Sequence, residues 1–332
     1  MKRMMLIFMV MTLGVAVFPY ESYAKTALAQ VRIKVVDQEG IVVPDAKIWG
    51  GFTCGSRMDD YVLVDGITNT NGEFVAQGKC NEFLRVDVTK EGYYQSEIKV
   101  NFLRSKADPR VVDGKWQPYG EMRTVVLKKI RNPIRLRDPD ARYRYKYPES
   151  GEWVGFDLVR GDWVLPLGNG ECTDVMIRYV RESKPDGYFK SLDISFTNNP
   201  YAGAYLMSKD SYSEMDSVYE ANTNAEYVGS FRYEFERTAK GNHVIRELGK
   251  DEYLVFRIRA KVDDEGELVS AHYGRIMGEL QYLERGGMVL GPVYFNPTPN
   301  DTNLEDAETA RKSRLGYKQS LEFERRRKAG GK

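Results

Sequence analysis

Apolar and polar residues alternate with a period of two along much of the chain. The alternation begins at Val31, where Val31, Ile33 and Val35 are apolar and the intervening Arg32 and Lys34 are charged. Such a pattern is typical of a strand that buries one face. It returns in several segments up to Leu127, separated by turns such as Asn71-Gly72, whose glycine supplies the positive φ of a tight hairpin. We therefore predict a series of strands in the first part of the chain.

The alternation resumes beyond residue 150. Apolar residues at every second position run from Leu254 to Val262, a turn follows at residues 263–266, and the pattern returns from Leu268. This is the clearest hairpin signal in the sequence. Residues 131–150 are rich in Arg, Tyr and Pro and have no apolar periodicity, which is typical of a linker. The sequence thus predicts an all-β protein with two domains, at residues 29–130 and 151–298.

The composition supports this architecture and argues against a nucleic-acid partner. The 332 residues include 30 Gly, 22 Tyr and 14 Phe but two His, a balance that favours strands and turns over helical bundles. Lys and Arg total 49 against 48 Asp and Glu. A dedicated nucleic-acid binder carries a strong basic excess, so we expect no nucleic-acid partner.

The first residues resemble an export signal. Lys2 and Arg3 precede an apolar run over residues 4–18, and Ser22-Tyr23-Ala24 places small residues where a signal peptidase cuts. The run is shorter than the roughly 20 residues of a membrane span. We therefore predict a signal peptide at residues 1–24, no membrane span after its cleavage, and an extracytoplasmic location, periplasmic or secreted.

Export permits disulfide bonds, and the predicted mature chain holds Cys54, Cys80 and Cys172. Cys54 and Cys80 lie in one predicted domain, so we predict that they form a disulfide and that Cys172 is unpaired. The alternative is that all three are small buried residues with free thiols.

Four short motifs occur in order in the first β region: Asp37-x-x-Gly40, Val43-Pro44-Asp45-Ala46-x-Ile48, Thr68-x-x-x-Gly72-x-Phe74 and Val88-x-Lys90-Glu91-Gly92-Tyr93. Together they resemble the carboxypeptidase regulatory-like domain. The resemblance implies a transthyretin-like β-sandwich of about seven strands over residues 29–130. The chain departs from the family at Asn69, where Asp is commoner, and in a Lys-, Asp- and Pro-rich insertion at residues 105–118. In that family the sandwich accompanies a catalytic domain and does not itself catalyse.

Catalytic and metal-binding motifs are sparse. His243 and Glu247 stand four residues apart, but the glycine at 241 indicates a turn there, so we predict no metal site and no cofactor. Cys172 has no histidine nearby in sequence, and we assign no catalytic residue. Asp157 with Asp174 stays open as the acid–base pair of a hydrolase, because the separation that matters is spatial.

Strand parity separates two tryptophans. Trp153 shares parity with Gly155 and Asp157 and is predicted to be exposed, whereas Trp163 shares parity with two leucines and is predicted to lie in the core. Flat aromatic faces bind sugars, so Trp153 is the candidate ligand-binding residue. The alternative is a partly buried tryptophan that seals a sandwich edge.

The last segment changes character. Residues 299–332 follow a Pro-rich stretch and hold few large apolar residues among many charges, which predicts a solvated charged tail.

We therefore expect an exported, non-catalytic binding or envelope-associated protein, with a glycan or an envelope protein as its partner. Two alternatives remain: a carboxylate-based hydrolase sited in residues 151–298, and a structural or assembly protein that uses an exposed strand edge or the basic tail.

Overall fold

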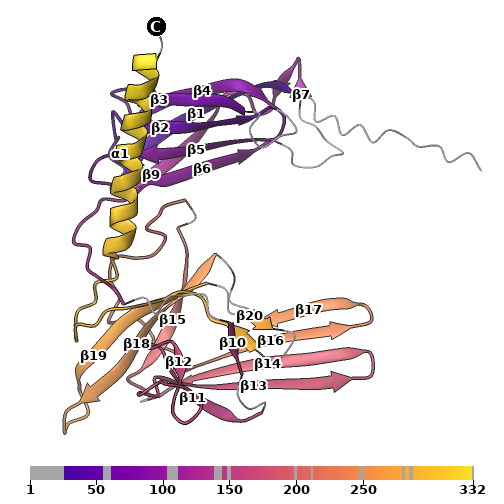
Figure 1. Ribbon diagram of the computed structural model, residues 1–332, viewed down its shortest axis with the longest axis vertical. Helices are drawn as coiled ribbons and strands as arrows, with labels where there is room; N and C mark the ends of the chain where they lie inside the picture. The colour runs from indigo at the N-terminus through magenta and orange to yellow at the C-terminus, as the bar shows by residue number, and fades with distance from the viewer. Residues whose placement is uncertain are drawn as a thin grey trace, which may run out of the picture.

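The computed structural model describes residues 26–54, 61–102, 111–137, 144–147, 151–197, 200–210, 212–246, 249, 251–278, 281–283 and 287–330. These residues form two β-rich domains and one long helix, α1 (Ala307–Gly330), which runs from the second domain across the first (Figure 1). The predicted signal peptide at residues 1–24 lies outside them. In the described part of the chain, no helix combines the length and apolar character needed to cross a membrane.

The first domain is a sandwich of two sheets. One sheet contains β4 (Glu73–Cys80), β1 (Ala27–Asp37), β9 (Glu121–Leu127), β8 (Lys115–Trp116) and β7 (Val111–Val112). The other contains, in order, β3 (Tyr61–Ile67), β2 (Lys47–Thr53), β5 (Phe83–Thr89) and β6 (Ser96–Asn101). The seven longer strands form the expected sandwich, and the short β7–β8 hairpin lies in the predicted insertion.

Alternation along the strands builds the core of this domain. Every second residue of β1, from Ala27 to Val35, is buried between the sheets. Trp116 from the short hairpin is fully buried against Phe102, and its indole Nε1 donates a hydrogen bond to the carbonyl of Cys80 at 2.8 Å. The insertion therefore contributes to the core and is not a detached loop.

The sequence motifs of the first domain converge at one end of the sandwich. The Thr68 hydroxyl accepts a hydrogen bond from the Ala46 amide and donates one to the Val43 carbonyl, both at 2.9 Å. The Oδ1 of Asn69 accepts hydrogen bonds from the backbone amides of Asn71 and Glu73, at 2.9 Å each, so Asn69 serves as the turn residue in place of Asp. Gly72 in this turn has a φ of 70°, which favours glycine.

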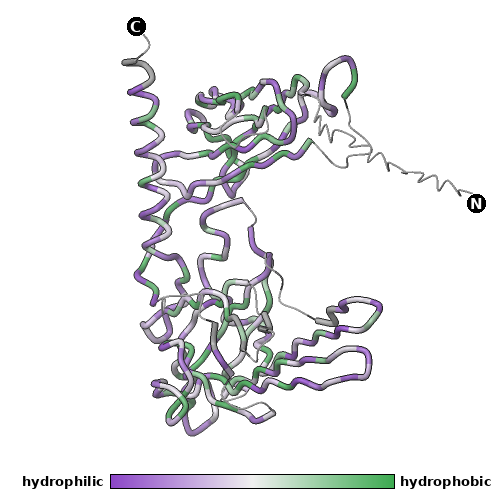
Figure 2. Tube along the Cα trace, turned by 45° about the vertical axis from the view of Figure 1, so that its right-hand side comes forward, coloured by the Kyte–Doolittle hydropathy of each residue, from purple (hydrophilic) through white to green (hydrophobic). Residues whose placement is uncertain are grey.

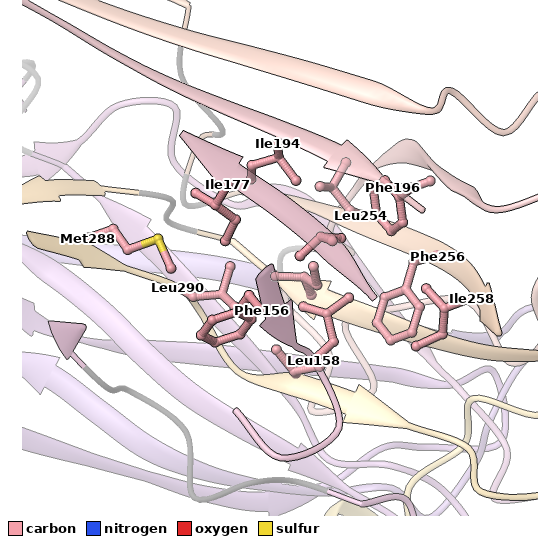
Figure 3. Close-up of a cluster of buried hydrophobic side chains, with 14 of the residues drawn as sticks. Phe156, Leu158, Ile177, Ile194, Phe196, Leu254, Phe256, Ile258, Met288 and Leu290 are labelled. Carbon is pink, nitrogen blue, oxygen red and sulfur yellow. The ribbon is translucent and has the colours of Figure 1, made fainter. Parts of the chain in front are cut away.

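The second domain is built mainly from two antiparallel sheets. The six-stranded sheet has the order β12 (Asp162–Trp163), β11 (Trp153–Asp157), β13 (Val175–Lys184), β14 (Gly187–Phe196), β16 (Ser230–Thr238), β17 (Gly241–Arg246). The four-stranded sheet has the order β15 (Gly203–Ser208), β18 (Glu252–Val262), β19 (Leu268–Met277), β22 (Val293–Phe295), so the predicted hairpin is β18–β19. Their core includes Phe156, Ile177, Phe196 and Phe256 (Figure 3).

The predicted linker at residues 131–150 is largely part of the second domain. Its strand β10 (Arg144–Lys146) joins β21 (Gly287–Val289) and β20 (Gln281–Leu283) in a small sheet. The Arg137 amide donates to the carbonyl of Phe295 at 2.7 Å, which adds this segment to the edge of β22. Pairing segments of two or three residues are too short to show apolar periodicity, which is why the sequence indicated a linker.

Most of the predicted charged tail at residues 299–332 is instead the helix α1, at residues 307–330, which packs on the first domain. Asp306 caps α1, since its Oδ2 accepts the Thr309 amide at 2.8 Å. The Phe323 ring lies 5.7 Å from that of Trp49, on the outer face of the β2 sheet. Figure 2 shows α1 as mostly hydrophilic. Because small residues such as Ala310 and Ser313 occupy its buried positions, the helix carries no strong apolar stripe.

A buried polar network joins the two domains where α1 begins. The Glu305 side chain is nearly fully buried and accepts hydrogen bonds from the Tyr94 hydroxyl at 2.9 Å and from the amides of Arg131 and Asn132 at 2.7 and 2.6 Å. Burial and the adjacent Glu305 carboxylate raise the pKa of Tyr94, which keeps its hydroxyl protonated as a donor. Backbone and side chains from both domains therefore meet on one carboxylate.

The predicted disulfide is absent, because Cys54, Cys80 and Cys172 all have free thiols. Cys54 and Cys80 lie at the ends of neighbouring segments, where the Asn81 amide donates to the Thr53 carbonyl at 2.8 Å. Cys80 however points into the core, its Sγ 3.5 Å from the Phe83 carbonyl, and burial raises the pKa of its thiol to about 12. The alternative is confirmed for the free thiols but not for burial, because Cys80 is buried whereas Cys54 and Cys172 are partly exposed.

Lys47 offers a test of how α1 and the sandwich are held together. Its side chain is 3% exposed and lies 2.5 Å from Asp65 and 3.2 Å from Glu324 of α1. Lys47→Met should reduce the free energy of unfolding by about 3–5 kcal/mol, because Asp65 would be left as an uncompensated buried charge. Urea titration measures this loss. The control is Lys34→Met, which removes a partner of the exposed Glu73 and should cost less than about 1 kcal/mol. Equal losses in the two variants would contradict this assignment.

Candidate functional site

Trp153 is exposed and Trp163 is buried, as predicted, although the residues on which the parity argument rested do not follow it. Leu165 and Leu167 are exposed and Asp157 is buried. Trp153 on β11 is 42% exposed, whereas Trp163 on β12 is 5% exposed. The Trp163 ring packs edge-on against Phe156 and Tyr147, at 5.2 and 5.1 Å between centroids. Trp163 is therefore a core residue, and the Trp153 ring is available on the outer face of the six-stranded sheet.

Strand register aligns charged residues beside Trp153. Trp153 lies opposite Arg178 of β13, which lies opposite Asp193 of β14, which in turn lies opposite Arg232 of β16. Directly paired residues on neighbouring strands point to the same face of a sheet. These four residues form a continuous row across four strands, which we term the Trp153 ladder.

Hydrogen bonds hold the ladder side chains in place. Arg178 donates from Nε and Nη2 to one Asp193 oxygen at 3.1 and 3.0 Å, and Arg232 donates from Nη1 to the other at 3.1 Å. The Arg178 guanidinium also lies 4.8 Å from the centroid of the Trp153 ring. Glu234 pairs with Arg232 at 2.5 Å, so the charges of the row are balanced. An aromatic ring and planar hydrogen-bonding groups are thus fixed side by side before any ligand arrives.

Such a surface has the chemistry of a site for a neutral polar ligand. A tryptophan face attracts C–H groups and apolar ring surface, while guanidinium groups donate hydrogen bonds at fixed angles. A rigid arrangement of side chains lowers the entropy lost on binding. Sugars combine C–H-rich faces with hydroxyl groups around their edges, which makes them suited to this arrangement.

Another cluster of charged side chains in this domain contains Asp157 and Asp174, the candidate acid–base pair of a hydrolase. Both side chains are buried, and Arg259 of β18 bridges them, donating from Nε to Asp174 at 2.9 Å and from Nη2 to both carboxylates at 3.1 Å. The strand is irregular at this point, and Arg259 has a φ of 54°. A β-bulge of this kind redirects a side chain. The fold thus brings the two acids together around one cation.

This pair is built as a structural ion pair. The Asp157 carboxylate also accepts hydrogen bonds, at 3.0–3.1 Å, from four backbone amides, those of Val159, Arg160, Glu171 and Cys172. Asp174 accepts the Leu158 amide at 3.1 Å, and burial raises its pKa against the opposing effect of Arg259. Every carboxylate oxygen of the pair has a protein donor, which leaves no oxygen directed at a substrate. The geometry therefore gives the pair a role in holding loops, not the role of acid and base.

Cys172 and His272 lie near this ion pair without the properties of a nucleophile and base. Burial, together with the neighbouring Asp174, raises the pKa of the Cys172 thiol, which disfavours the reactive thiolate. Burial lowers the pKa of His272, whose ring stacks on Phe295 at 5.2 Å. His243 is exposed on β17, and Glu247 lies outside the described residues. In the part of the chain that the structure describes, no three His, Cys, Asp or Glu side chains gather as a metal site.

Sequence reasoning found Trp153 but not its neighbours in the ladder. The signal for Arg178 was present, since it alternates with buried Ile177 and Tyr179 on β13. Asp193 and Arg232 were not accessible in the same way, because their positions depend on the register between strands. The register of β14 with β16 joins residues about 40 apart across a long intervening segment.

Comparisons with known proteins were made for sequence and for fold. No family model matches the chain, and no curated protein matches it. Catechol 1,2-dioxygenase from Acinetobacter radioresistens matches 32% of this chain at 15% identity and a TM-score of 0.25, and the match spans 54% of that enzyme, about half its length. A streptococcal ancillary pilin matches 84% of this chain and 62% of its own, at 10% identity and a TM-score of 0.20. A protein from Bacteroides uniformis with a proposed carbohydrate-binding role matches 81% of this chain and 98% of its own, at 8% identity and a TM-score of 0.18.

The two tryptophans should differ sharply in their effect on stability. Trp163→Ala should lower the free energy of unfolding by about 3–5 kcal/mol because it leaves a cavity in the core. Trp153→Ala should cost less than about 1 kcal/mol, since the ring is on the surface. Urea unfolding followed by circular dichroism measures both. If Trp153→Ala is the more damaging change, the ladder is part of the structural framework and not a free surface.

Arg259 should be essential for folding if the acid pair is structural. Arg259→Met leaves two buried carboxylates close together, so we expect a loss of about 3–5 kcal/mol at neutral pH. The loss should shrink as the pH falls, because protonation removes the repulsion. The control is Arg160→Met, which breaks the exposed pair with Glu171 and should change stability by less than about 1 kcal/mol. A stable Arg259→Met protein would argue against the structural role.

Proposed function

We propose that this chain is an exported binding protein that holds a carbohydrate on the outer face of its second domain. The observation that carries the proposal is the Trp153 ladder, in which an exposed tryptophan lies beside two fixed guanidinium groups and a buried carboxylate. The ligand we propose is a glycan whose ring faces Trp153 and whose hydroxyl groups bond to Arg178 and Arg232.

The extracytoplasmic location belongs to the same proposal. It is supported by the basic start, the apolar run and the small residues before Lys25. We further propose that residues 29–130 are a carboxypeptidase regulatory-like domain. The support is the order of the four motifs together with the way Thr68 and its neighbours join them at one end of a two-sheet sandwich.

A second candidate function, assembly through a strand edge, has one specific observation in its favour. In the described part of the chain β6 pairs with β5 on one side, and its other edge meets a segment of the second domain, where the Glu97 amide donates to the Tyr212 carbonyl at 2.6 Å. A groove of about 380 Å³ continues between β6 and β9. Unpaired strand edges can accept a strand from another chain.

A glycan array with three proteins tests the carbohydrate proposal. The wild type should bind a defined set of glycans, and Trp153→Ala should weaken binding to them at least about tenfold, which corresponds to roughly 1.4 kcal/mol. The matched control is Tyr61→Ala, which removes an exposed aromatic ring from the first domain and should leave binding unchanged. Absence of glycan binding by the wild type would refute the function, and equal binding by Trp153→Ala would refute the site.

A further inference from the structure

A cleft of about 950 Å³ opens where α1 leaves the second domain. One wall is residues 135–137 of the former linker, a second is β22 with the residues after it, and the third is the first two turns of α1. The cleft lies apart from the Trp153 ladder, and none of its residues belongs to that surface. Its volume is in the range of ligand-binding pockets.

Cationic side chains line opposite walls of the cleft. Arg135 and Arg137 stand two apart on an extended segment whose middle residue, Leu136, is buried, so both arginines project from the side away from Leu136. Lys312 lines the cleft from α1. The side chains of these three residues form no hydrogen bond or ion pair with any residue that the structure describes. The described lining of the cleft therefore holds four cations, Arg135, Arg137, Arg311 and Lys312, against two acids, Asp306 and Glu308, and Glu308 interacts electrostatically with Lys312 as well as with Arg311.

The acidic residues of the cleft are already engaged. Asp306 caps α1 and accepts both the amide and the hydroxyl of Thr309, at 2.8 and 2.9 Å. Glu308 forms a two-bond pair with Arg311, at 2.6 and 2.7 Å. The backbone amides at the N-terminus of α1 are therefore not what would attract an anion to the cleft. The attraction comes from Arg135, Arg137 and Lys312.

The distribution of these cations indicates the shape of the ligand. The whole chain has a formal net charge of +1, so four cations against two acids in the lining of one concave site are a local positive excess that attracts anions. Residues two apart on an extended strand lie about 7 Å from each other, and Lys312 stands on another wall. An extended chain with a negative group on successive units can therefore contact cations on more than one wall at the same time. Tyr294 and Pro297 also line the cleft, and the buried Arg275 guanidinium lies over the Tyr294 ring, 4.5 Å from its centroid.

We infer that this cleft binds an acidic oligosaccharide, whose carboxylate or sulfate groups pair with Arg135, Arg137 and Lys312 while its rings lie against Tyr294 and Pro297. The inference adds a second, charge-selective site and does not rest on the Trp153 ladder. Carboxylate and sulfate groups both suit the arginines, because guanidinium forms paired hydrogen bonds with planar or tetrahedral oxyanions.

The test compares two charge-matched triple variants of the full chain by isothermal titration calorimetry. One variant is Arg135→Gln, Arg137→Gln and Lys312→Gln in the cleft. The control is Arg314→Gln, Lys318→Gln and Arg325→Gln, which neutralises three exposed cations of α1 outside the cleft. The probes are oligogalacturonate for carboxylate, chondroitin sulfate oligosaccharides for sulfate, a neutral galactose oligomer, a single-stranded oligonucleotide and inorganic sulfate.

We expect the wild type and the control to bind at least one acidic oligosaccharide, and the cleft variant to lose at least tenfold in affinity with little change in melting temperature. Which acidic probe binds identifies the anionic group. The inference is overturned if neither acidic probe binds, if the control loses as much as the cleft variant, or if the oligonucleotide or inorganic sulfate binds the cleft as tightly as the sugars. Loss of acidic-sugar binding in the cleft variant with intact binding in Trp153→Ala separates this site from the ladder.

Discussion

The arrangement of the two domains depends on a buried carboxylate, Glu305. Glu305 lies just before α1. Its carboxylate accepts a hydrogen bond from the Tyr94 hydroxyl of the first domain and two from the backbone amides of Arg131 and Asn132, at the start of the connecting segment. A buried carboxylate is tolerated only when its oxygens are satisfied, so these three donors must stay together in the folded state. The residues on either side are thereby fixed: residues 131–137 on one side and the capped first turn of α1 on the other. These are two of the walls of the cationic cleft, whose shape therefore follows from this one network.

The second domain uses the same residue types in two opposite ways. Around Arg259, two aspartates are buried and saturated by backbone amides, so the charges serve the fold. In the Trp153 ladder, Asp193 lies between two arginines whose guanidinium groups remain partly exposed beside an aromatic ring. The two clusters differ in exposure, because the side chains of Asp157 and Asp174 are 2% and 1% exposed whereas those of Arg178 and Arg232 are 35% and 49% exposed. Charge identity alone did not distinguish a structural pair from a binding surface, whereas exposure and hydrogen-bond saturation did.

Much of the candidate site followed from local pattern and part of it did not. The exposure of Trp153 and the burial of Trp163 agree with the prediction, but the parity argument behind it does not extend along a whole segment, because β12 ends at Trp163 and Leu165 and Leu167 beyond it are exposed. The partners of Trp153 could not be predicted, because Asp193 and Arg232 reach it through the register of strands distant in sequence. For the same reason the sequence offered Asp157 and Asp174 as a possible catalytic pair and gave no sign that Arg259 bridges them.

By itself the sequence determined the β character of both domains and, along strands such as β1, the inward or outward face of each residue. These are consequences of period-two alternation and of turn residues, which act within a few positions. The tertiary structure alone decided that residues 307–330 form a docked helix, that much of the linker pairs with the second domain and that Cys80 is buried in the core with a free thiol. Each of these depends on contacts between distant segments. The buried positions of α1 are small or polar, such as Ala310 and Ser313, so the helix is held by fit and hydrogen bonds that leave no hydrophobic pattern in the chain.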